Sequence, residues 1–163
     1  MLIEDEVVKY YSSNKLFLAC AESCTGGLIS KRITDISGAS KMFGYGICTY
    51  ANEAKMKLLG VNSDTLLNYG AVSSNTAREM AEGLLMLSGA DVVICTTGMA
   101  SPGGMPTEKP VGMVFVGIGS KMFGVRVIEL SLGHLITRER IRNATVDTAL
   151  SEALLEAKRI CKG

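Results

Sequence analysis

Along the first hundred positions, short continuous apolar runs alternate with stretches whose apolar residues recur every three or four residues. Continuous runs of this length are typical of buried strands, and the run at 16–21 predicts a strand covered on both faces. The spaced stretches predict helices. Strands are expected at 16–21, 44–50 and 92–96, and helices at 1–14, 28–36, 51–59, from residue 63 onward and at 73–88.

The last third of the chain has a different order. Residues 111–119 and 125–130 predict adjacent strands with Gly124 in or beside their turn, and 137–161 predict one long helix. Helices that alternate with strands, followed by a hairpin and a terminal helix, predict an α/β fold. We expect a three-layer α/β/α sandwich with a mixed, mostly parallel central sheet. Residues 1–163 are expected to form a single domain.

Three loops are expected to form the ligand-binding edge of this sheet. Ligands of open α/β sheets bind beyond the carboxyl ends of the strands. The segments that follow the first three predicted strands are 22–27, 50–55 and 98–109. The functional residues are therefore expected in these segments.

Composition narrows the range of partners. The formal net charge is +1, without the basic excess of a nucleic-acid binder. The longest apolar run, at 111–119, is too short to cross a bilayer, and acidic residues stand at 4–6, where an export signal would be basic. Five cysteines without paired spacing are typical of a reducing compartment. We expect a cytoplasmic protein with neither nucleic acid nor membrane as a partner.

The segment around Ser23 is the first candidate for chemistry. Ser23 lies where a predicted strand ends and a helix begins, and Gly26 and Gly27 follow it. Glycines there allow a tight turn with exposed amides, which suit a phosphate or an oxyanion together with the helix dipole. A serine at such a turn is placed to attack an electrophile. The same pattern also fits Ser23 or Thr25 as a helix cap without a catalytic role.

A nucleophilic serine needs a base, and the sequence offers few. His134 is the only histidine, and it is expected in an exposed loop. A lysine serves as a base when burial or a nearby cation lowers its pKa. Lys55 and Lys109 lie on the expected edge of the sheet, although either position also fits a solvated surface lysine.

Cys24 is an alternative nucleophile, because a helix N-terminus lowers the pKa of a thiol. The competing interpretation is a small buried hydrophobic residue. Cys20 and Cys24 lack the spacing of a zinc site, so no metal is predicted. The loop at 98–110 has no phosphate-binding fingerprint, yet its length before a strand favours a ligand-binding role.

Five segments together resemble one family. They are 21–27 (Ala-Glu-Ser-Cys-Thr-Gly-Gly), 49–55 (Thr-Tyr-Ala-Asn-Glu-Ala-Lys), 69–73 (Tyr-Gly-Ala-Val-Ser), 97–100 (Thr-Gly-Met-Ala) and 109–112 (Lys-Pro-Val-Gly). In this order they resemble the CinA C-terminal domain family, the nicotinamide-nucleotide amidohydrolases. Several motifs in register make the resemblance far more specific than any one of them.

The resemblance implies an enzyme that hydrolyses the carboxamide of nicotinamide mononucleotide to nicotinate mononucleotide and ammonia. It implies a Ser–Lys mechanism without a metal or another cofactor, in which Ser23 is the nucleophile, Lys55 the general base and Tyr50 a support of the proton network. Lys55 then needs a pKa well below its ordinary value. The implied substrate-binding residues are Thr25, Gly26, Gly27, Gly98, Gly103, Gly104, Lys109 and, at the phosphate, Arg142.

Two segments differ from the family pattern. Ser101 stands where the usual Gly-Ile-Ala-Gly-Pro-Gly-Gly loop has glycine, and residues 132–138 differ from the usual Gly-Asp-Arg and are longer. A second hypothesis is therefore a nucleotide-binding regulatory module without catalysis. Members of the family tend to assemble, so a homo-oligomer is expected.

Overall fold

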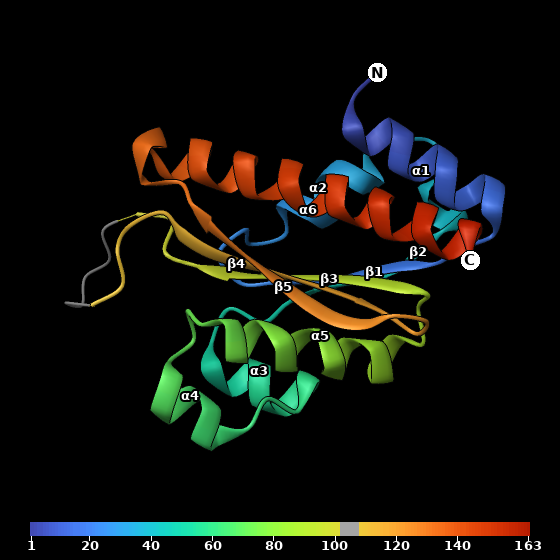
Figure 1. Ribbon diagram of the computed structural model, residues 1–163. Helices are drawn as coiled ribbons and strands as arrows, with labels where there is room; N and C mark the ends of the chain where they lie inside the picture. Colours follow the sequence, from blue (N-terminus) through green and yellow to red (C-terminus); the bar gives the residue numbers. More distant parts are fainter. Residues whose placement is uncertain (102–107) are drawn as a thin grey trace.

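A central sheet with helices on both faces forms the three layers of the computed structural model, which describes residues 1–101 and 108–163 (Figure 1). The helices are α1 (Ile3–Asn14), α2 (Leu28–Thr34), α3 (Asn52–Leu59), α4 (Ser63–Tyr69), α5 (Ser74–Ser88) and α6 (Arg138–Lys162). The strands are β1 (Leu18–Glu22), β2 (Phe43–Cys48), β3 (Val92–Gly98), β4 (Met113–Ser120) and β5 (Gly124–Ser131). Each expected element is confirmed, and short 3-10 helices at Ala39–Lys41 (η1) and Gly133–Leu135 (η2) were not predicted.

The strand order among the described residues is β2-β1-β3-β4-β5. β1 pairs in parallel with both β2 and β3, whereas β4 is antiparallel to β3 and to β5. All of these strands except β4 therefore run in one direction, which confirms the mixed, mostly parallel sheet. The carboxyl ends of β1, β2 and β3 lie side by side, so the loops that follow them meet at one edge.

The helices divide between the two faces of the sheet. α1, α2 and α6 cover one face, and α3, α4 and α5 cover the other (Figure 1). β1 is buried along its whole length, as its continuous apolar run predicts. Each face has its own apolar core, one built around α1, α2 and α6 and one around α5 and the end of α3. No helix in the described part of the chain is long and apolar enough to cross a membrane.

Several helix ends follow directly from sequence signals. The Ser73 hydroxyl caps α5 by accepting a hydrogen bond from the Thr76 amide at 3.1 Å. Gly60 and Gly89 end α3 and α5 in the left-handed conformation, with φ of +66° and +63°. Ala51 occupies the N-cap of α3 and makes no side-chain cap bond, so α3 depends more on its packing.

α3 is packed against α5 at a glycine. A Cβ atom added to Gly83 of α5 would lie 1.8 Å from the backbone oxygen of Leu59, the last residue of α3. Only glycine allows the two helices to approach this closely. This contact matters for the site because α3 carries Lys55.

Candidate functional site

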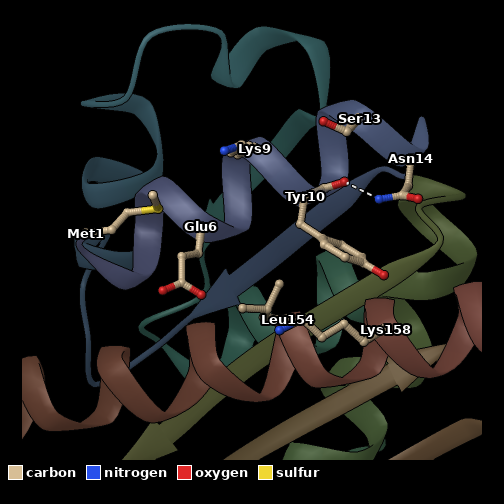
Figure 2. Close-up of a pocket in the computed structure, with 8 residues that line it drawn as sticks. All are labelled: Met1, Glu6, Lys9, Tyr10, Ser13, Asn14, Leu154 and Lys158. Atoms are coloured by element: carbon tan, nitrogen blue, oxygen red, sulfur yellow. Dashed lines mark hydrogen bonds between the residues drawn. The ribbon is translucent and has the colours of Figure 1, made fainter.

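A cavity of about 240 Å³ opens at the edge where the loops after β1, β2 and β3 meet. The three loop segments predicted from the sequence, 22–27, 50–55 and 98–109, all contribute residues to this cavity, as does the start of α6. Its lining consists of Ser23, Cys24, Tyr50, Lys55, Ala71, Val72, Thr97, Gly98, Met99, Ala100, Ser101 and Arg138. A second hollow, of about 370 Å³, lies between α1 and α6 (Figure 2). None of its lining residues comes from the loops that follow the strands.

Ser23 is the first residue after β1, and its position is fixed by the neighbouring strand. Its amide donates to the carbonyl of Thr96 in β3 at 3.0 Å, which continues the pairing of β1 with β3. The residue is buried except for 8% of its surface. Its hydroxyl therefore faces the cavity and not bulk solvent.

Lys55 is a basic group in direct contact with Ser23. Its side chain is fully buried, and Nζ lies 3.1 Å from Ser23 Oγ. Nζ also donates to the backbone carbonyls of Thr49 at 2.7 Å and Tyr50 at 3.2 Å. These two residues follow β2, so the sheet edge and the first turns of α3 together bring the amine to the serine.

Burial lowers the pKa of Lys55 from its ordinary value, because the charged form loses its hydration. Within the described residues, no carboxylate forms a salt bridge with it. The contact geometry also suits the uncharged form. A neutral amine has two N–H groups for the carbonyls of Thr49 and Tyr50, and its lone pair is left to accept the proton of Ser23.

A buried carboxylate organises the turn after Ser23. Glu22 has no exposed surface, and its carboxylate accepts hydrogen bonds from the Thr25 hydroxyl at 2.6 Å and the Gly27 amide at 3.1 Å. It also accepts from the amides of Ile29 at 3.0 Å and Ser30 at 2.9 Å, in the first turn of α2. Sequence reasoning missed this role. The available signal was an acidic residue at the end of a fully apolar strand.

These bonds correct one expectation about the glycines. The Gly26 amide donates to the carbonyl of Ser23 at 3.1 Å, and the Gly27 amide donates to Glu22. Both amides are therefore used within the turn and are not directed at a ligand. The positive φ values of Gly26 (+57°) and Gly27 (+99°) show why glycine is required there. Thr25, with no exposed surface, is likewise part of the turn and not of the cavity wall.

Cys24 lies beside Ser23 on the cavity wall, but its chemistry is suppressed. Burial raises the pKa of its thiol to about 11. Thr96 bonds to the thiol and lies 2.7 Å from the Thr25 hydroxyl, which in turn donates to Glu22. The hydrogen bond with Thr96 lowers the pKa of the thiol, but burial outweighs it.

The other residues predicted to bind substrate, together with Tyr50, do not all lie at this cavity. Gly98 lines the cavity, whereas Gly103 and Gly104 lie outside the described residues. Lys109 lines a neighbouring hollow with residues 70–72 and Glu108. Tyr50 lies at the cavity with 66% of its surface exposed, and its backbone carbonyl accepts a hydrogen bond from Lys55.

The two arginines at the start of α6 have different positions. The Arg142 guanidinium donates to the carbonyl of Thr25 at 2.5 Å and does not line the Ser23 cavity. Arg138 does line this cavity, and it donates to the hydroxyl of Ser101. The structure therefore presents Arg138 to the cavity, where sequence reasoning expected Arg142, and ties Arg142 to the turn after Ser23.

A strained turn sets where α6 begins. Ile136 has φ of +69° and ψ of −48°, and the Thr137 amide donates to the carbonyl of Leu135 at 2.7 Å across it. This is a γ-turn of the rare, strained hand, and a β-branched residue is unfavourable in it. Thr137 then caps the helix, and Arg138 is its first residue. His134, in η2 just before this turn, is exposed as predicted.

Among the described residues, no group of three histidine, cysteine, aspartate or glutamate side chains is arranged to hold a metal ion. The polar groups that line the cavity include the Ser23 hydroxyl, the buried amine of Lys55 and the guanidinium of Arg138. That combination suits acyl transfer from a substrate with an anionic group.

Comparison with known proteins points to one family. A family model described as the CinA C-terminal domain matches residues 2–157. A competence-damage inducible protein from Thermoanaerobacter pseudethanolicus is 51% identical over 148 residues, which cover 91% of this chain and 35% of that protein. A CinA-like protein from Chloroherpeton thalassium is 45% identical over 153 residues, which cover 90% and 36%. The chain thus spans about a third of the length of these curated relatives.

Solved structures share the fold over nearly the whole chain. The competence/damage inducible protein CihA from Agrobacterium tumefaciens is 40% identical, with a TM-score of 0.90 and coverage of 94% of this chain and 93% of that one. A CinA superfamily protein from Escherichia coli is 30% identical, with a TM-score of 0.86 and coverage of 94% and 87%.

Proposed function

Because this chain belongs to the CinA C-terminal domain family, we propose that it hydrolyses the carboxamide of nicotinamide mononucleotide, with Ser23 as nucleophile and Lys55 as general base. The observation that carries the proposal is the 3.1 Å distance between the buried Lys55 Nζ and Ser23 Oγ. Serine paired with lysine is one of the recurring variants of the serine–histidine arrangement.

In the first half of the reaction, Ser23 becomes acylated. Uncharged Lys55 accepts the hydroxyl proton while Oγ bonds to the carboxamide carbon, and the carbonyl electron pair moves onto its oxygen. When this tetrahedral species collapses, the bond from carbon to nitrogen breaks. Lys55 returns its proton to the departing nitrogen, which leaves as ammonia.

In the second half, water releases the product. Lys55 accepts a proton from water, whose oxygen attacks the ester carbon, and the bond from carbon to Ser23 Oγ breaks. Ser23 regains a proton from Lys55, and nicotinate mononucleotide leaves. The same amine thus acts as base and acid in each half, which requires a pKa lower than that of an ordinary lysine.

The cavity offers suitable contacts for the rest of this substrate. Arg138 is the cationic residue of the lining other than Lys55, so we assign it to the phosphate. The exposed ring of Tyr50 at the same cavity is suited to pack against a pyridine ring. This assignment replaces Arg142, which is bonded to the Thr25 carbonyl.

Ammonia release from nicotinamide mononucleotide by the purified protein tests the proposal. Ser23→Ala and Lys55→Ala are expected to abolish turnover while the folded state persists, as judged by thermal melting. Lys57→Ala is the matched control, because Lys57 lies on the same helix with its side chain in solvent. Near-normal turnover in either site variant would refute its assigned role.

Two further results would favour the competing hypotheses. Tight binding of the mononucleotide with no product over many hours would favour a regulatory binding module. Loss of activity in Cys24→Ser would favour a cysteine nucleophile, whereas the raised pKa of this thiol predicts that activity is retained.

A further inference from the structure

Glu22 is an ionisable residue in the middle of the site that the proposed reaction does not use. Its side chain has no exposed surface, and within the described residues it forms no salt bridge. An isolated carboxylate is very unfavourable in such a place unless several donors satisfy it. Three of the donors here are the backbone amides of Gly27, Ile29 and Ser30. The others are the hydroxyls of Thr25 and Ser30 and the thiol of Cys20.

We propose that Glu22 is a positioning residue, which holds the turn at Ser23 so that the hydroxyl meets the amine of Lys55. The inference rests on the proposed serine nucleophile but not on the identity of the substrate. Glu22 itself does not face the cavity, so it acts through the backbone that it binds.

The hydrogen bonds of Glu22 connect the two elements that flank the nucleophile. Glu22 is the last residue of β1, and the amides that it binds belong to the first turn of α2. Gly27, at the N-cap of α2, has no side chain to supply this cap. The carboxylate therefore ties the end of the strand to the start of the helix, and Ser23 lies in the short loop between them.

Only a carboxylate satisfies this set of donors. Each of its two oxygens accepts three hydrogen bonds, Oε2 from Thr25, Gly27 and Ile29, and Oε1 from Cys20 and Ser30. A glutamine has the same shape, but its amide nitrogen would face donors in place of one oxygen. Glu22→Gln is therefore expected to loosen the turn without removing any bulk.

The effect on reactivity follows from the short distance at the site. Ser23 Oγ and Lys55 Nζ are 3.1 Å apart, within the range over which a proton is transferred directly. A displacement of about 1 Å in such an arrangement costs on the order of 100-fold in rate. Glu22 is not among the groups that shift the pKa of Lys55, so Glu22→Gln is expected to alter the distance and to leave that pKa unchanged.

The test follows the reaction of Ser23 with a fluorophosphonate, measured as adduct mass on the intact protein from pH 6 to about 10, the range that brackets a lowered lysine pKa. The reaction needs no nucleotide, so it separates this inference from the choice of substrate. Ser23→Ala verifies the labelled residue. Glu156→Gln is the matched control, because Glu156 is 2% exposed and accepts from the Ser120 hydroxyl at 2.6 Å, away from the cavity.

Glu22→Gln is expected to lower the rate of Ser23 modification by about 10- to 100-fold at every pH, with the midpoint of the pH profile unchanged. Glu156→Gln is expected to react like the wild type at a temperature where both variants are folded. With nicotinamide mononucleotide, Glu22→Gln is expected to lower kcat and leave KM within about twofold, since the ligand contacts are intact.

A wild-type rate of Ser23 modification in Glu22→Gln would overturn the inference, as would an equal loss in Glu156→Gln. If Glu22→Gln does not fold, Glu22→Asp replaces it, because the charge is kept and the reach is shortened by one methylene. A wild-type rate in that variant would equally overturn the inference. If the labelling follows these expectations while the mononucleotide is not hydrolysed, the proposed substrate is wrong and the role of Glu22 stands.

Discussion

The contact of Gly83 with the end of α3 allows a sharp prediction for Gly83→Ala. A Cβ atom at Gly83 would lie 1.8 Å from the oxygen and 2.6 Å from the carbonyl carbon of Leu59. Ordinary contact begins at 3.4 Å, so the two helices must separate by about 1.6 Å, the difference between 3.4 and 1.8. The atoms in conflict belong to the backbone, and no change of rotamer relieves them.

This separation is expected to reach the site. Leu59 lies one turn after Lys55 on α3, and a shift of α3 lengthens the 3.1 Å contact between Lys55 Nζ and Ser23 Oγ. We expect kcat/KM to fall by about 10- to 100-fold. Overpacking is also expected to lower the free energy of unfolding by about 1–3 kcal/mol. Helix propensity alone predicts the opposite sign, because alanine inside a helix is favoured over glycine by about 1 kcal/mol.

The assay compares thermal melting and ammonia release for the wild type, Gly83→Ala and Gly44→Ala. Gly44 is a suitable control because its added Cβ would meet nothing within 4 Å and its φ is not positive. A Gly83→Ala protein that melts at a higher temperature and keeps full activity would refute the reasoning. A loss of stability with unchanged activity would show that α3 moves without carrying Lys55 away from Ser23.

Four further predictions concern the pH response and the start of α6. Burial lowers the pKa of Lys55, so kcat/KM is expected to rise with pH to a plateau below pH 10.5, the ordinary value for lysine. Lys55 binds its proton more tightly in the unfolded chain than in the folded protein, so the free energy of unfolding, measured in urea, is expected to rise with pH between the two pKa values of Lys55. Lys55→Met is expected to reduce this dependence on pH. Ile136→Gly is expected to raise Tm by about 2–4 °C, because the strain of a positive φ exceeds the entropic cost of glycine by roughly 1 kcal/mol. Arg138→Gln is expected to raise KM for the mononucleotide by about 10- to 100-fold, the value of a charge-assisted hydrogen bond, with no effect on the riboside that lacks the phosphate.

The sequence was most informative where the signals are local. Ser73 and Gly89 fix the ends of α5 through bonds within one turn, and the apolar run of β1 requires burial on both faces. The edge that carries the site was also predictable, because parallel strands place the loops that follow them together. The same grounds make Ser23 and Lys55 candidates from the sequence alone.

The contacts that sequence reasoning missed join positions far apart in the chain or depend on backbone geometry. Arg142 bonds to Thr25 across 117 positions, and which arginine of α6 faces the cavity depends on the turn at Ile136. The amides of Gly26 and Gly27 were expected to face a ligand. In the structure the Gly26 amide bonds to Ser23, and the Gly27 amide bonds to the carboxylate of Glu22, which comes from the preceding strand. No local pattern reveals such a bond, although an acidic residue in an apolar strand indicates that donors must surround it.

The charge of Lys55 in the free protein is the most direct test of the account. Nitrogen NMR of lysine-labelled protein reports the protonation of each Nζ as pH is raised, and comparison with Lys55→Met assigns the resonance. We predict that Lys55 loses its proton at a lower pH than the exposed lysines of the same chain. An Nζ that remains an ammonium group throughout the pH range in which those lysines titrate would contradict its assignment as the base of Ser23.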